Sequence, residues 1–358
     1  MPRAFDPASD VSRVWHLIPA GDWKGVSSER FYYPETYEKD GFVHLSSLPQ
    51  QLIDVGNHFY KKVGGDFIVL ELDAERCVAS GGRIKWEPPA AVGATKAHAE
   101  KPLFPHLYGG LPVDAVVREF AVVRDAEGTF YSLDKYDPPL KGIVFDCDGT
   151  LINSEPLWHI AEGEVFASVG MPFDAEKDGL LTTGLAIEEV AQFWKEKRGF
   201  DCSAKEVAEK IILRVTELIK DRGVPMDGVH ESIAFAKKMF GDRIAIASSS
   251  ATVIIMASLQ AIGVEPDTFS CICSAQDEAF GKPHPAVYLT ACAKLGVDPK
   301  NALALEDSEN GMASALAAGM KVIALPVSIE EKFSPAHAIL NSLKDFDANV
   351  LGALISPP

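Results

Sequence analysis

Apolar and polar positions follow different patterns in the two halves of the chain. In the second half, short apolar runs typical of buried strands cover residues 143–146, 244–248, 271–274, 302–307 and 321–325. Segments with helical spacing of apolar residues lie between them, such as residues 284–296 and 306–319. Repeated strand–helix units predict an α/β fold, a Rossmann-like parallel sheet with helices on both faces.

A long segment after the first of these strands breaks the alternation. Between Glu155 and Gly228 the strand-like runs vanish, and residues 188–197 and 204–222 show helical periodicity. We expect a helical cap at about residues 157–228 that covers the carboxyl ends of the strands. Ligands of parallel sheets bind at those ends, and a cap there excludes water.

The first half has short β-type runs at residues 14–18, 41–46, 67–72 and 115–123, and one helical segment at residues 49–63. Gly, Pro and Asp clusters separate them. The polar stretch before residue 142 contains Pro138 and Pro139 and is typical of a linker. We therefore predict a small α+β domain over residues 1–134, a linker over 135–141 and the α/β domain over 142–358.

Composition narrows the classes of partner. The chain has 358 residues and a formal net charge of -17, which disfavours nucleic acid as a partner. It has no apolar run of about 18 residues and no secretory leader, so we expect no membrane association and a cytoplasmic location. Six cysteines without CxxC spacing favour reduced thiols. A small anionic substrate stays compatible with this charge if a cation reverses the local field.

The segment Asp146-Cys147-Asp148-Gly149-Thr150 directly follows the first apolar strand of the second half. Two carboxylates and a tight turn at a strand end suit a hard cation such as Mg²⁺. Asp146 is placed to attack phosphorus and form an aspartyl-phosphate. Asp148 is placed to protonate the leaving oxygen and later to activate water. The alternative is an ordinary Asp-Gly turn with a solvated carboxylate.

Three further strand ends carry polar groups. Ser248 ends one strand, Lys282 lies in a loop with two prolines, and Glu306-Asp307 ends another strand. Ser248 and Lys282 are expected to bind phosphate, and the acidic pair a cation. Each has an ordinary structural alternative: a helix cap for Ser248, an exposed loop residue for Lys282, and a cap of the next helix for one of the two carboxylates. Four such groups in one order make coincidence a poor explanation.

In these motifs the second half resembles the haloacid dehalogenase superfamily. The resemblance implies a Mg²⁺-dependent phosphatase and assigns roles to six residues. The nucleophile is Asp146 and the acid–base group is Asp148; the phosphate ligands are Ser248 and Lys282; the metal site comprises the Asp146 side chain, the Asp148 carbonyl, Asp307, and Glu306 acting through water.

Within this superfamily the cap and the motifs look like the phosphoglucomutase-like branch, and most like phosphatases of 2-deoxyglucose 6-phosphate and hexitol phosphates. The resemblance implies a small phosphorylated metabolite as substrate, with Glu155, His159, Ser249 and Gly184 as candidate contacts. Ala186 stands where those phosphatases carry an arginine, which leaves the substrate open. A sugar phosphomutase with the same core, or a non-catalytic phosphate sensor, is the alternative.

The first half contains His16, His44, Ser46 and His106 in strand-like or turn contexts. Residues 14 to about 124 resemble a family of small domains of unknown function whose fold is related to ADP-ribosyltransferases. That resemblance makes these four residues candidates for a nucleotide-binding cleft, and three histidines also leave a metal site open. The alternative is a regulatory or binding module that assists the phosphatase.

Overall fold

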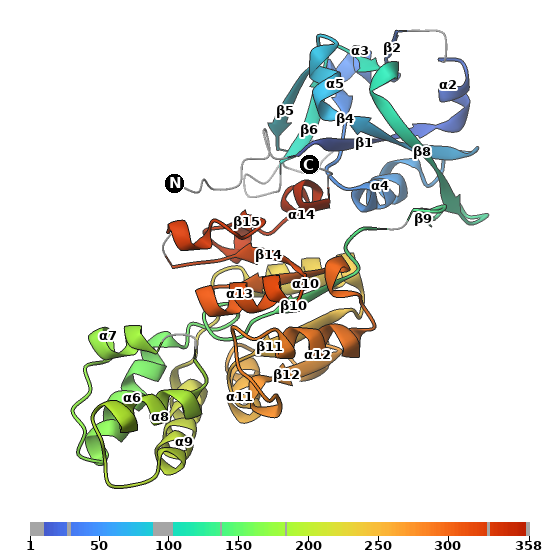
Figure 1. The fold of residues 1–358 in the computed structure, drawn as a ribbon. Helices are drawn as coiled ribbons and strands as arrows, with labels where there is room; N and C mark the ends of the chain where they lie inside the picture. Colours follow the sequence, from blue (N-terminus) through green and yellow to red (C-terminus); the bar gives the residue numbers. More distant parts are fainter. Residues whose placement is uncertain are drawn as a thin grey trace. The chain divides into compact units, whose positions relative to one another are not determined.

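The computed structural model describes residues 11–26, 30–88, 103–136, 138–182, 185–327 and 330–355 (Figure 1). The chain forms two compact units. Leu140–Asp345 form one of them, which we call the α/β unit. The other unit, which we call the α+β unit, comprises Phe5–Pro139 and the residues from Phe346 onward.

A six-stranded sheet of neighbour order β12-β11-β10-β13-β14-β15 is the centre of the α/β unit, and all its pairings are parallel. The predicted parallel sheet is confirmed. Its strands are β10 (Gly142–Phe145), β11 (Ile244–Ser248), β12 (Cys271–Ser274), β13 (Ala302–Glu306), β14 (Lys321–Ala324) and β15 (Ala338–Ile339).

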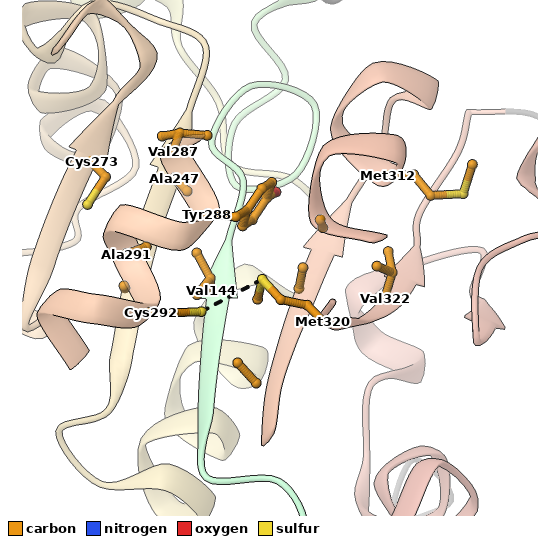
Figure 2. Close-up of a cluster of buried hydrophobic side chains, with 14 of the residues drawn as sticks. Val144, Ala247, Cys273, Val287, Tyr288, Ala291, Cys292, Met312, Met320 and Val322 are labelled. Atoms are coloured by element: carbon orange, nitrogen blue, oxygen red, sulfur yellow. Dashed lines mark hydrogen bonds between the residues drawn. The ribbon is translucent and has the colours of Figure 1, made fainter. Parts of the chain in front are cut away.

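Helices connect these strands and cover the sheet. They are α10 (Val229–Phe240), α11 (Thr252–Ala261), α12 (Ala286–Leu295) and α13 (Glu309–Ala317). Figure 2 shows α12 against the strands, with Val144, Ala247 and Tyr288 in one buried cluster. Small side chains such as Ala247 bring the helix close to the strands. Because alternate strand residues face opposite sides, Ile143 and Phe145 point away from this cluster.

The segment between β10 and α10 is helical, as the periodicity predicts. It contains α6 (Glu155–Ser168), α7 (Ala175–Asp178), α8 (Ile187–Lys197) and α9 (Ala204–Arg222). A reciprocal pair of hydrogen bonds starts α9: the Glu206 N–H donates to Ser203 Oγ at 3.1 Å, and Ser203 N donates to Glu206 Oε2 at 2.8 Å. Trp194 of α8 is fully buried. We call these four helices the cap.

The α+β unit contains antiparallel sheets. β1 (Arg13–Pro19), β4 (Phe67–Asp73), β8 (Val116–Arg124) and β9 (Phe130–Leu133) form the largest. The smaller sheets contain β3 (Val43–His44), β6 (Phe104–Tyr108) and β5 (Arg83–Glu87), and β2 (Phe31–Tyr32) with β7 (Leu111–Pro112). Its short helices are α2 (Ala20–Lys24), α3 (Tyr37–Asp40), α4 (Pro49–Val55), α5 (Ala74–Ala79) and α14 (Ala348–Ile355). Among the described helices, none combines the length and apolarity needed to cross a membrane.

Two elements of the α+β unit differ from the sequence-based expectation. The expected helix over residues 49–63 is α4 followed by a π-helical turn over Gly56–Tyr60. Gly56 lies against the Phe130 ring, where a Cβ atom would approach to 2.4 Å, so only glycine fits. The expected strand over residues 41–46 is only the two-residue β3. Gly41 cannot extend it toward the N-terminus, because its φ of 77° is left-handed.

Helix α14 belongs to the α+β unit, although it follows the α/β unit in sequence. The side chain of Asn349 donates a hydrogen bond to the main-chain oxygen of Leu103 at 3.0 Å and accepts one from Ser47. Gly352 faces the Ser47 main chain, where a Cβ atom would meet an oxygen at 2.6 Å. The α+β unit is therefore built from two segments of the chain.

Candidate active site

Parallel strands bring the predicted catalytic residues to one edge of the sheet. β10 lies between β11 and β13, and the pairing aligns their carboxyl ends. Asp146 directly follows β10, Ser248 ends β11, and Glu306 ends β13. Lys282 comes from the loop before α12 and is 4% exposed. Its burial rules out the alternative that Lys282 is an exposed loop residue.

Lys282 links the two neighbouring strand ends. Its Nζ donates to Oδ1 of Asp146 at 2.7 Å and to Oε1 of Glu306 at 2.6 Å. A third hydrogen bond reaches the main-chain oxygen of Ala247 at 3.0 Å. The Tyr288 hydroxyl donates to the same Glu306 oxygen at 2.5 Å. Groups from β11, β13 and α12 thus hold the ammonium against Asp146.

Burial and neighbouring charges shift the pKa values of these groups. Burial raises the pKa of Asp146 to about 8, although Lys282 opposes the shift. Burial raises the pKa of Asp307 well above its ordinary value, and Asp146 and Glu306 add to this rise. For Lys282, burial favours the neutral amine, but the carboxylates of Asp146 and Glu306 outweigh it and raise its pKa. The site therefore has an excess of negative charge.

Three carboxylates form an acidic cluster at this edge. Oxygens of Asp146, Glu306 and Asp307 lie within 4.8 Å of one another. Gly149 makes room for Asp307: its φ is +74°, and a Cβ atom there would lie 2.0 Å from Oδ2 of Asp307. Lys282 is the one cation that hydrogen-bonds to this cluster within the described part of the chain. Three carboxylates and one ammonium suit a divalent cation, so the donor set fits a metal ion.

The two acidic residues of β13 differ in their surroundings. Oε1 of Glu306 accepts hydrogen bonds from Lys282 and Tyr288, and Oε2 accepts from Ser308 Oγ at 3.2 Å. Both oxygens of Glu306 are therefore engaged. The side chain of Asp307 has no such partner among the described residues, so it is better placed than Glu306 to bind a metal directly.

Asp148 is held by the cap and by the loop after β11. Its Oδ1 accepts from Ser154 Oγ at 2.6 Å and from Trp158 Nε1 at 3.1 Å. Its Oδ2 accepts from Ser250 Oγ at 2.7 Å and from Ser248 Oγ at 3.5 Å. Donors on both oxygens therefore fix the orientation of this side chain.

A cavity of about 510 Å³ lies over these residues, between the strand ends and the cap. Asp146, Asp148, Ser248, Lys282 and Asp307 line it. The candidate substrate contacts Glu155, His159 and Ser249 also line it. Gly184 lies outside the described residues.

Sequence reasoning missed several polar groups of the site. Ser250, Ser154 and Trp158 bind Asp148, and Tyr288 binds Glu306. The Ser248-Ser249-Ser250 run was a signal for Ser250. Trp158 and Tyr288 sit in helices without a local signal, because only the packing brings them to a strand end.

The structure also brings the candidate residues of the α+β unit near one another. His44 and His106 pair across β3 and β6, with ring centroids 5.4 Å apart. Nδ1 of His16 donates to the main-chain oxygen of His44 at 2.8 Å. The main chain of Ser46 pairs with that of Trp15, the residue before His16. Burial lowers the pKa of His16 to about 4, so its ring is neutral near pH 7. Within the described residues no group of three metal ligands includes these histidines, and a nucleotide-binding role stays a prediction.

Together with the family and relatives that follow, the capped parallel sheet and its acidic strand ends identify an enzyme that hydrolyses phosphate monoesters. The chain belongs to the haloacid dehalogenase-like hydrolases, whose family model matches residues 140–319. Residues 17–119 match a second family, described as a protein of unknown function, DUF952. Both resemblances expected from the sequence are confirmed.

Individual relatives match the α/β unit. Hexitol phosphatase B of Escherichia coli (strain K12) is 37% identical over 212 residues, which are 58% of this chain and 95% of that protein. Protein CbbY of Cereibacter sphaeroides is 31% identical over 217 residues, 58% of this chain and 94% of that protein. The crystal structure of a mutant CbbY from Rhodobacter sphaeroides in complex with xylulose-(1,5)bisphosphate has a TM-score of 0.54 and 29% identity, and covers 57% of this chain and 96% of that one.

Proposed function

We propose that the α/β unit hydrolyses the phosphate monoester of a small polyol or sugar, through an aspartyl-phosphate on Asp146 and with Mg²⁺. The observation that carries this proposal is the hydrogen-bonded Asp146–Lys282 pair beside Asp307, at the floor of a capped cavity. The substrate class is supported by the hexitol phosphatase and CbbY relatives. A cavity of about 510 Å³ falls in the size range of small-molecule sites.

Asp146, Asp307 and the main-chain oxygen of Asp148 would hold the Mg²⁺. Two like unit charges ~4 Å apart repel by about 4 kcal/mol at an effective dielectric near ~20. An attacking carboxylate meets at least this repulsion from a phosphate dianion. A bound Mg²⁺ would supply positive charge that offsets the repulsion. Glu306 has a different role in this proposal: it fixes the Lys282 ammonium beside Asp146.

The chain's own groups carry the proton and bond changes. A carboxylate oxygen of Asp146 attacks phosphorus, the ester P–O bond breaks, and protonated Asp148 gives its proton to the leaving oxygen. Asp148 is then a carboxylate, and its four hydrogen-bond donors hold its side chain in place. It next takes a proton from the water that attacks the aspartyl-phosphate, so phosphate leaves and Asp146 is restored. Lys282 and Ser248 are placed to bind phosphate oxygens.

Phosphate release from a panel of sugar and polyol phosphates, with and without Mg²⁺, tests the proposal. The wild type should release phosphate only with Mg²⁺. Asp146→Asn should lose turnover but keep the fold, whereas Asp277→Asn, at an exposed position of the same unit, should behave as wild type. Turnover retained in Asp146→Asn would refute the nucleophile. Isomerised sugar phosphate in place of free phosphate would identify a mutase.

A further inference from the structure

One face of helix α6 forms part of the cavity wall. Glu155, Trp158, His159 and Glu162 follow the spacing i, i+3, i+4 and i+7, which places them on one side of a helix. All four line the same cavity as Asp146 and Lys282. The cap therefore presents polar groups to whatever is attached to the phosphate.

Glu162 differs from its neighbours on this face. It is 7% exposed, and none of the hydrogen bonds or ion pairs found among the described residues involves its carboxylate. Trp158, by contrast, donates to Asp148. Burial alone raises the pKa of Glu162 to about 7. A buried carboxyl group without a partner is costly, and the other buried residues of α6 are apolar, among them Leu157 and Val165.

We propose that Glu162 determines specificity by accepting hydrogen bonds from hydroxyl groups of the substrate's leaving group. The proposal rests on the phosphatase function of the same site. A hydroxylated leaving group supplies the partner that the chain does not provide. Two carboxylate oxygens can accept from two hydroxyls on neighbouring carbons, which favours a polyol. A site built to bind a hydroxyl discriminates strongly against an analogue that lacks it, because its polar group is then left unpaired.

Two substrates separate this role from catalysis: a hexitol 6-phosphate, and phenyl phosphate, whose leaving group has no further hydroxyl. The full-length chain is assayed with Mg²⁺ as wild type, Glu162→Leu and Glu162→Gln. Glu188→Gln is the control, because Glu188 is an exposed cap residue outside the cavity wall. Circular dichroism and thermal unfolding establish that each variant is folded.

Glu162→Leu should lower kcat/KM for the hexitol phosphate by about 10- to 100-fold, the loss expected for a charged hydrogen bond. It should change kcat/KM for phenyl phosphate by less than about threefold, and Glu162→Gln should retain part of the discrimination. Equal losses of kcat/KM for both substrates, or an unchanged kcat/KM for the hexitol phosphate, would overturn the role of Glu162 but not the phosphatase assignment. A wild type that releases phosphate from neither substrate would overturn the phosphatase assignment and this inference together.

Discussion

Replacing Glu162 by glutamine tests the buried carboxyl group without any substrate. Its pKa in the folded chain is about 7, against an ordinary value of 4.5, because the charged form is buried. The folded chain thus holds this proton more tightly than the unfolded chain. Stability therefore falls as pH rises from 4.5 to about 7, and the full penalty applies above pH 7. The gap between the two values corresponds to about 3 kcal/mol.

Glutamine has a similar shape and no charge, so it lacks this dependence. The difference in unfolding free energy between Glu162→Gln and the wild type should shift in favour of the variant by about 2.5 kcal/mol between about pH 5 and about pH 8.5. Urea unfolding followed by circular dichroism at both pH values measures it, and Glu188→Gln should show no such change. A variant-to-wild-type difference that is the same at both pH values would refute the reasoning.

Three other substitutions test the catalytic edge of the sheet. Gly149→Ala forces a left-handed φ on alanine, at a conformational cost of about 1–2 kcal/mol, and places a Cβ atom against Asp307. The Mg²⁺ concentration for half-maximal activity should therefore rise on the order of tenfold. Gly163→Ala, where nothing lies within 4 Å of the added atom, is its control, and equal Mg²⁺ requirements would contradict the account. Lys282→Met removes the cation from the buried carboxylates of Asp146 and Glu306, and it should cost about 3–5 kcal/mol in urea unfolding and abolish activity. An unchanged unfolding midpoint would argue against the ion pairs. Asp148→Asn should slow formation and breakdown of the aspartyl-phosphate by about 10²- to 10⁴-fold in rapid-quench assays, and normal kinetics would exclude its acid–base role.

The sheet and the catalytic edge are predictable from the sequence for one physical reason. Strands buried on both faces are continuous apolar runs, and the polar residue that ends each run is easily recognised. Asp146, Ser248 and Glu306 were found in this way. Their mutual contacts follow because parallel neighbours end at the same edge of the sheet.

The missed features depend on packing between distant segments. Glu162 has the sequence context of an ordinary surface residue of a helix, and only the assembled cap shows that it is buried. Strands of two residues, such as β2 and β7, are too short to show periodicity. The residues of α14 form an apolar run, but no local pattern tells which unit the helix joins.

The position of α14 has a consequence for how the protein is made. During synthesis, the first strands of the α+β unit leave the ribosome long before the residues of α14, with the whole α/β unit translated in between. The surface on β1 and around Ser47 that α14 covers therefore stays open until then. A gene truncated after residue 345 should yield an intact catalytic unit beside an unfinished α+β unit. Production of the α+β unit on its own therefore requires the residues of α14 together with the first segment of the chain.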